Sequence, residues 1–112
     1  MSYQAGDIVW ARFFADKLRP GVVVGNDRYV RSVVLVCPGT GTLLGGPVRI
    51  RLEPEETGLS AATEIMPHRL QSLPPNKLQE VVGRMPAARW EQLEDVLLDL
   101  LGLQSACQRL LR

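Results

Sequence analysis

Short apolar stretches recur along residues 1–85 and are separated by glycine, proline, asparagine and aspartate. Stretches of this length that are bounded by turn-forming residues are typical of β-strands. We therefore predict strands at residues 8–14, 21–25, 33–37, 47–52, 63–71 and 79–85. Because proline cannot donate a ladder hydrogen bond, Pro67 predicts an edge or a bulge inside the fifth strand.

The spacing of apolar positions changes to that of an amphipathic helix in residues 86–101, where Trp90, Leu93 and Leu97 fall on one face. Residues 104–112 predict a short helix or a frayed end. The pattern thus predicts a mainly β fold of five to six strands with one main C-terminal helix. The strands should form a small, strongly bent sheet across which the helix packs.

The length of 112 residues fits one domain, which we place at residues 1–112. No apolar run approaches the ~20 residues that a membrane helix needs, and the N-terminus lacks the pattern of a signal peptide. Two cysteines, Cys37 in an apolar run and Cys107 near the end, fit a reducing cytoplasm better than a disulfide scaffold. The net charge of +1 provides no overall field to attract nucleic acid. We expect a cytoplasmic protein that spans no membrane.

Metal and nucleotide motifs are absent from the sequence. One histidine and two distant cysteines do not have the spacing of metal ligands, so we predict neither a metal nor a cofactor. The glycine-rich segment 39–46 lacks the lysine and the following helix of a P-loop. This segment is more typical of a flexible hairpin connection.

The segment from Lys17 to Val24 places an arginine and a proline at the beginning of an apolar strand. Pro20 fixes its own φ and favours an extended Arg19, so the guanidinium should project from the rim of the sheet. A fixed guanidinium matches the oxygens of a phosphate, although an ordinary surface arginine beside a turn proline fits the same residues. Thr40 should reach the same rim, either as a turn residue or as a hydroxyl that orients a ligand.

Other polar residues have two interpretations each. His68 is either a half-exposed strand residue or a general acid or base, because its unperturbed pKa of ~6.5 suits proton transfer near neutrality. Arg49 and Arg51 share one face of the fourth strand, and Arg28 lies close to a turn. These arginines either contact phosphates or form a solvated face. Candidates for base stacking are Phe13, Phe14 and Tyr29, each of which fits the core equally well.

Six segments appear in the same order as in one known family. They are Gly6-Asp7-Ile8-Val9-Trp10, Lys17-Leu18-Arg19-Pro20-Gly21-Val22-Val23-Val24, Asn26-Asp27, Val34-Leu35-Val36-Cys37-Pro38-Gly39-Thr40, Gly58-Leu59-Ser60 and Val82-Gly83-Arg84-Met85. Together they resemble the PemK/MazF/Kid toxins of bacterial toxin–antitoxin modules, within the CcdB/PemK-like superfamily. The resemblance covers about residues 5–103.

This resemblance implies an SH3-like barrel with a C-terminal helix, assembled as a homodimer. It also implies a metal-independent endoribonuclease, an mRNA interferase that cleaves single-stranded RNA and is held inactive by a cognate antitoxin. Operator DNA would be bound only in complex with that antitoxin. In this chemistry a ribose 2′-OH attacks the adjacent phosphate and leaves a 2′,3′-cyclic phosphate and a 5′-OH.

The resemblance also implies roles for individual residues. Arg19 matches the catalytic arginine of the family, and Thr40 matches the threonine that positions the phosphate. The family pattern Asp-Gln-x-Arg aligns with His68-Arg69-Leu70-Gln71, so His68 is implied to take over proton transfer. RNA contacts are implied for Arg69 and for two residues of the short first connection, Asp16 and Lys17.

Two other functions remain open at this point. One is a poison of DNA gyrase like the CcdB toxins, although residues 101–107 do not present the Trp-Gly-Ile-like tip on which that action depends. The other is a barrel that has lost catalysis and serves as a binding or regulatory module. Gly41, where the family has a second hydroxyl residue, favours the binding module, whereas Arg19 and Thr40 oppose it.

Overall fold

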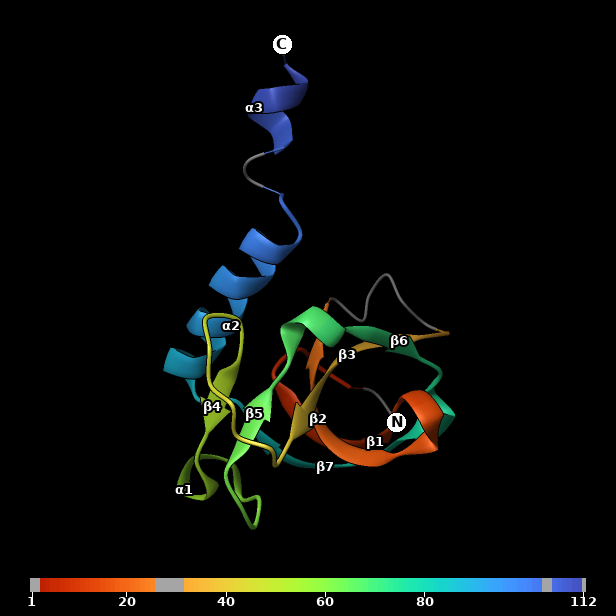
Figure 1. Cartoon of the computed structure of the whole chain (residues 1–112). Helices are drawn as coiled ribbons and strands as arrows, with labels where there is room; N and C mark the ends of the chain where they lie inside the picture. The colour runs from red at the N-terminus through yellow and green to blue at the C-terminus, as the bar shows by residue number, and fades with distance from the viewer. Residues whose placement is uncertain (1–2, 26–31, 104–105, 112) are drawn as a thin grey trace.

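The structure, a computed structural model, describes residues 3–25, 32–103 and 106–111 (Figure 1). The strands in this part of the chain are β1 (Asp7–Arg12), β2 (Leu18–Val24), β3 (Val34–Thr40), β4 (Ile50–Leu52), β5 (Thr63–Ile65), β6 (Gln71–Leu73) and β7 (Leu78–Arg84). The helices are α1 (Pro54–Thr57), α2 (Ala87–Leu100) and α3 (Ala106–Leu110), with short 3₁₀ helices η1 (Phe14–Asp16), η2 (Pro67–Arg69) and η3 (Pro75–Lys77).

The strands form one curved antiparallel sheet in the order β4-β5-β3-β2-β1-β7, and β6 pairs with β3 beside this path. In the described part of the chain, the terminal strands β4 and β7 do not pair with each other, so the sheet stays open. The predicted class, a mainly β fold with a C-terminal helix, is confirmed. The sheet has seven strands instead of five or six, because the chain turns at Pro67 and splits the predicted fifth strand into β5 and β6.

The bend in β3 positions the site. The first half of β3 pairs with β2 and β6, whereas Gly39 and Thr40 pair with Ile65 and Glu64 of β5. A Cβ atom at Gly39 would lie 2.7 Å from Cγ2 of Thr63 and 3.0 Å from the Pro20 carbonyl oxygen. Only glycine leaves room for β3 to pass this closely between its neighbours.

Residues 36–40 of β3 are buried on both faces of the strand, in agreement with the apolar run predicted for the third strand. Adjacent residues such as Val36 and Cys37 belong to two different clusters of the core, and both side chains are fully buried. Leu93 of α2 closes one cluster by packing over it. Trp90, Val96 and Leu97 of α2 pack against the same cluster. The C-terminal end of α2 extends away from the sheet, and α3 lies farther out (Figure 1). No helix in the described ranges combines the length and apolar character that a membrane crossing requires.

Three boundaries differ from the prediction. β3 continues through the Pro-Gly pair to Thr40, so Thr40 is a strand residue and not part of the loop that follows. β2 already begins at Leu18, and Arg19 therefore lies within the ladder, opposite Ala11 of β1. The predicted strand at 47–52 is reduced to the short β4, since the chain pairs with β5 only from Ile50 onward.

Candidate active site

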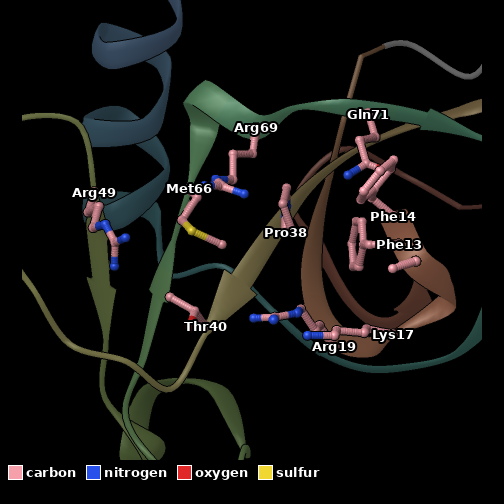
Figure 2. Close-up of a pocket in the computed structure, with 11 residues that line it drawn as sticks. Phe13, Phe14, Lys17, Arg19, Pro38, Thr40, Arg49, Met66, Arg69 and Gln71 are labelled. Carbon is pink, nitrogen blue, oxygen red and sulfur yellow. The ribbon is translucent and has the colours of Figure 1, made fainter.

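A pocket of about 420 Å³ opens where β2 and β3 separate (Figure 2). Side chains from the β1–β2 connection, both of these strands and the segments around β4 and η2 surround it. The lining residues are Phe13, Phe14, Ala15, Lys17, Arg19, Pro38, Thr40, Arg49, Met66, Arg69 and Gln71. The pocket therefore collects residues from distant parts of the chain. It holds five of the predicted catalytic and RNA-binding residues together with the stacking candidates Phe13 and Phe14.

Arg19 and Thr40 share this pocket because of the strand register. Gly21 pairs with Pro38, and two further residues along each antiparallel strand lead to Arg19 and Thr40. Figure 2 shows the Arg19 side chain extending from β2 toward the side of the pocket where Thr40 lies. Thr40 is buried, and its Oγ1 accepts a hydrogen bond of 3.1 Å from the Thr42 N–H. The predicted placement of both residues on one rim is confirmed.

The charge of the pocket is one-sided. Its described lining includes the four cations Lys17, Arg19, Arg49 and Arg69, and no carboxylate. The charge of Arg49 is balanced by an ion pair, because its Nη1 lies 3.0 Å from Oε1 of the buried Glu64. Among the ion pairs within the described residues, none involves the other three cations. Such a site attracts a polyanion and can stabilise negative charge that develops on a phosphate.

Glu64 keeps its charge despite its position. Burial alone would raise the pKa of its carboxyl, but hydrogen bonds from Arg49, Leu44 and Gly45 together with the charge of Arg49 lower it below its usual value. The carboxylate therefore remains ionised at neutral pH and faces the donors that surround it.

The two neighbouring phenylalanines have different environments. Phe13 is 6% exposed and belongs to the core, whereas Phe14 is 85% exposed and stands at the pocket (Figure 2). The following residues, Ala15 and Asp16, have φ values of 62° and 57°. This left-handed conformation is rare for residues other than glycine and costs of order 1–3 kcal/mol each. The tight turn presents the Phe14 ring to solvent.

Three predicted site residues lie outside the lining set. His68 is exposed on η2, so its predicted position in a strand is wrong. Asp16 pairs with Lys77 at 3.1 Å on the surface. Arg51 pairs with Glu53 at 2.9 Å and does not line the pocket. Arg28, also predicted to bind RNA, falls outside the described residues, as does the stacking candidate Tyr29.

Sequence reasoning missed two polar residues of the site. Gln71 lines the pocket, and Glu64 forms an ion pair with the lining residue Arg49. For Gln71 a signal exists: the segment Arg69-Leu70-Gln71 inverts the order of the family pattern Gln-x-Arg, and the structure brings both side chains to the pocket. For Glu64 the signal is a charged residue in a strand whose other two residues, Thr63 and Ile65, are uncharged.

The cysteines and potential metal ligands lie apart from this chemistry. Burial raises the pKa of the Cys37 thiol to about 12, and Cys107 is exposed. Over the described ranges, no three side chains of the metal-binding types come together.

Comparison with known proteins defines the class of the chain. Residues 4–101 match the model of the PemK-like, MazF-like toxins of type II toxin–antitoxin systems. This chain therefore belongs to the PemK/MazF-like toxin family.

Individual relatives agree with this assignment. The chain is 31% identical over 93 residues to the probable endoribonuclease MazF of Mycolicibacterium smegmatis. The aligned region covers 80% of this chain and 85% of the relative. It is 31% identical over 91 residues to endoribonuclease MazF9 of Mycobacterium tuberculosis, with coverages of 74% and 77%. The crystal structure of MazF from Deinococcus radiodurans superposes with a TM-score of 0.78 at 25% identity, covering 91% of this chain and 98% of that one.

Proposed function

We propose that this protein is the toxin of a type II toxin–antitoxin module and cleaves single-stranded RNA. The observation that carries the proposal is the shared pocket of Arg19 and Thr40, lined by further cations. Relatives named endoribonuclease MazF support the same activity. The pocket would hold one RNA phosphate between the Arg19 guanidinium and the Thr40 hydroxyl.

In the proposed reaction the ribose 2′-oxygen attacks the adjacent phosphorus, and the bond from phosphorus to the 5′-oxygen breaks. The products are a 2′,3′-cyclic phosphate and a 5′-OH, with the proton of the 2′-OH passing eventually to the 5′-oxygen. Negative charge builds on the non-bridging oxygens in the transition state. Arg19 offers a forked set of N–H donors for this charge, and Thr40 offers its hydroxyl hydrogen. The chemistry requires no metal ion.

RNA binding extends beyond this phosphate. Lys17 and Arg69 lie on either side of the pocket and would contact neighbouring phosphates of the strand. Phe14 would stack on a base, because its ring is exposed and every base presents a π-face. Asp16 and Arg51 were predicted to contact RNA. Because each forms an ion pair with another residue, we expect both to contribute little to RNA binding.

Proton transfer by His68 is a separate proposal, supported by its position next to the pocket-lining Arg69. If His68 removes or delivers the proton, His68→Ala slows cleavage by about 100-fold. An unchanged rate would assign the transfer to solvent or to the phosphate itself.

The family also supplies the proposed partners. We expect a cognate antitoxin whose acidic segment covers the cationic pocket, and solved MazE–MazF complexes of Deinococcus radiodurans support an antitoxin partner. Operator DNA would be bound only together with this antitoxin. The exposed leucines Leu100, Leu101 and Leu103 at the end of α2 support a homodimer, which sedimentation analysis tests directly. The compartment would be the cytoplasm, where mRNA is available.

The decisive assay incubates the purified protein, free of antitoxin and with a chelator present, with a long single-stranded RNA. We expect cleavage that falls by about 10²–10³-fold in Arg19→Ala and in Thr40→Val. Arg51→Ala is the matched control, because it removes an arginine that is paired outside the pocket, and it should cleave normally. Equal losses in all three variants would contradict the assigned site.

A second candidate, an RNA-binding module without catalysis, is favoured by two observations. Gly41 stands where the family pattern has a second hydroxyl residue, so this chain lacks that hydroxyl. In addition, the described pocket lining includes no carboxylate or imidazole. This alternative predicts that the protein shifts single-stranded RNA in a gel, with an affinity that depends on Arg19, but leaves every phosphodiester intact.

A further inference from the structure

Glu64 is a buried charged group that the reaction described above does not use. Its side chain is 3% exposed on β5, and in the sheet it lies between Thr40 of β3 and Arg51 of β4. It does not line the pocket. A buried carboxylate is costly unless donors surround it, so its partners indicate why it is there.

The partners of Glu64 all lie in the segment that follows Thr40. Its carboxylate accepts the N–H of Leu44 at 2.9 Å and the N–H of Gly45 at 2.9 Å. It also accepts Nη1 of Arg49 at 3.0 Å. One buried group thus fixes two backbone amides and one guanidinium, although the side chains of residues 41–46 are exposed.

Two further hydrogen bonds connect this cluster to the pocket. Nη1 of Arg49 also donates to the Thr42 carbonyl oxygen at 3.0 Å. The N–H of Thr42 donates to Oγ1 of Thr40 at 3.1 Å. Both polar groups of the Thr42 backbone are therefore held, one by Arg49 and the other by Thr40.

This arrangement determines which way the Thr40 hydroxyl can donate. A hydroxyl oxygen that accepts a backbone N–H has its own hydrogen available for another acceptor. Within the described residues, no acceptor for this hydrogen is found, and Thr40 lines the pocket. The hydroxyl hydrogen is therefore available to solvent and to an oxygen atom of a ligand bound in the pocket.

We propose that Glu64 is a positioning residue, which acts through Arg49 and Thr42 to hold the Thr40 hydroxyl toward the scissile phosphate. This inference rests on the proposed RNA cleavage. It also gives Arg49 a different task from the predicted RNA contact: its Nη1 is committed to Glu64 and Thr42. Glu64 does not act as a base in this proposal, because it does not line the pocket and all its partners are donors.

The test compares Glu64→Gln with Glu80→Gln, a glutamate that is exposed on strand β7. The glutamine side chain replaces one acceptor oxygen with an NH2 donor, which would face the N–H donors of Leu44, Gly45 and Arg49. We therefore expect these hydrogen bonds to weaken or break. We expect the single-turnover cleavage rate to fall by about 10–100-fold in Glu64→Gln, with the Kd for RNA changed by less than about threefold. Glu80→Gln should match the unchanged protein in both.

A double variant separates positioning from general loss of structure. If Glu64 acts through the hydroxyl, Glu64→Gln causes no further loss of rate in a Thr40→Val background, and Thr40→Ser retains the sensitivity to Glu64→Gln. If the loss of rate in the double variant equals the product of the two single losses, the inference is overturned. A wild-type rate in Glu64→Gln would overturn it as well.

Amide hydrogen exchange provides a readout that does not depend on cleavage. Exchange at Thr42, Leu44 and Gly45 should be faster in Glu64→Gln and unchanged in Glu80→Gln; equal exchange would contradict the clamp. If the unchanged protein fails to cleave RNA, the proposed function fails, whereas faster exchange would still show that the clamp exists. Should Glu64→Gln not fold, Arg49→Met removes the same link and is expected to give the same loss of rate and faster exchange at Thr42.

Discussion

Thr40 and Arg49 line one side of the pocket, and the segment 40–49 that they bound is tied to a buried carboxylate. Residues 14–17 on the other side are held by their own turn and by a surface ion pair (Figure 2). We call these two segments the clamped wall and the exposed wall. The clamped wall carries the Thr40 hydroxyl, and the exposed wall carries the Phe14 ring. Under the proposed function we infer a division of work, in which the clamped wall aligns the phosphate and the exposed wall accommodates bases.

Among the substitutions that test the two walls, Gly39→Ala should have the largest effect on stability. A Cβ at this position approaches Thr63 and the Pro20 carbonyl, so β3 would be pushed away from its neighbours and the clamped wall displaced. We expect a loss of about 3 kcal/mol in the free energy of unfolding, measured by urea denaturation. Gly41→Ala is the control: a Cβ there meets no atom within 4 Å, and stability should change by less than about 0.5 kcal/mol.

The exposed wall is tested by Phe14→Ala. Losing one base–aromatic stack should weaken RNA binding by about 10-fold, within the range of ~1–3 kcal/mol per stacked base. Because the ring is 85% exposed, the melting temperature should stay the same. Fluorescence anisotropy with a short RNA measures the affinity, and an affinity equal to that of the unchanged protein would remove Phe14 from the binding surface.

Because Glu64 holds the clamped wall, the free energy of unfolding should decrease at low pH. The pKa of Glu64 is lower in the folded state than its ordinary value of 4.5, so the folded state favours the ionised carboxylate. Its contribution is fully present above that ordinary value and is lost as the pH falls through the lower folded pKa. Urea denaturation between pH 7 and pH 3 should show this decrease, and Glu64→Gln should reduce it. An identical decrease in the variant would separate Glu64 from the acid sensitivity.

The smallest effect is expected from Asp16→Asn in the exposed wall. Its ion pair with Lys77 has side chains that are 64% and 43% exposed, so solvent screens the attraction. The free energy of unfolding should change by less than about 0.5 kcal/mol, and RNA cleavage should be retained. A loss comparable with that of Glu64→Gln would show that the two walls are not held differently.

Much of the fold could be predicted from the sequence. The alternation of apolar stretches and turn residues located every strand approximately except β6, which begins where the predicted fifth strand ends. The helical spacing located α2. The Pro-Gly pair at residues 38–39 suggested the end of a strand, because both residues usually interrupt a ladder. In the structure the same pair allows β3 to change partners, and the strand continues to Thr40.

The site was only partly predictable. Arg19 and Thr40 could be placed together because both follow from local strand ends and from the family resemblance. Glu64 could not be placed, since its role depends on the registers of β3, β4 and β5 and on a loop that folds back over them. His68 was placed in a strand because Pro67 indicated a bulge, whereas the chain makes a 3₁₀ turn there.

The central claim is that Arg19 and Thr40 act on the same phosphate. The most direct test is a double-mutant cycle of Arg19→Ala and Thr40→Val on single-turnover RNA cleavage, with folding checked by circular dichroism. We predict that the double variant loses about as much activity as Arg19→Ala alone, because groups that act as a unit are strongly non-additive. Losses that simply multiply, or an unchanged protein that leaves RNA intact, would contradict the account.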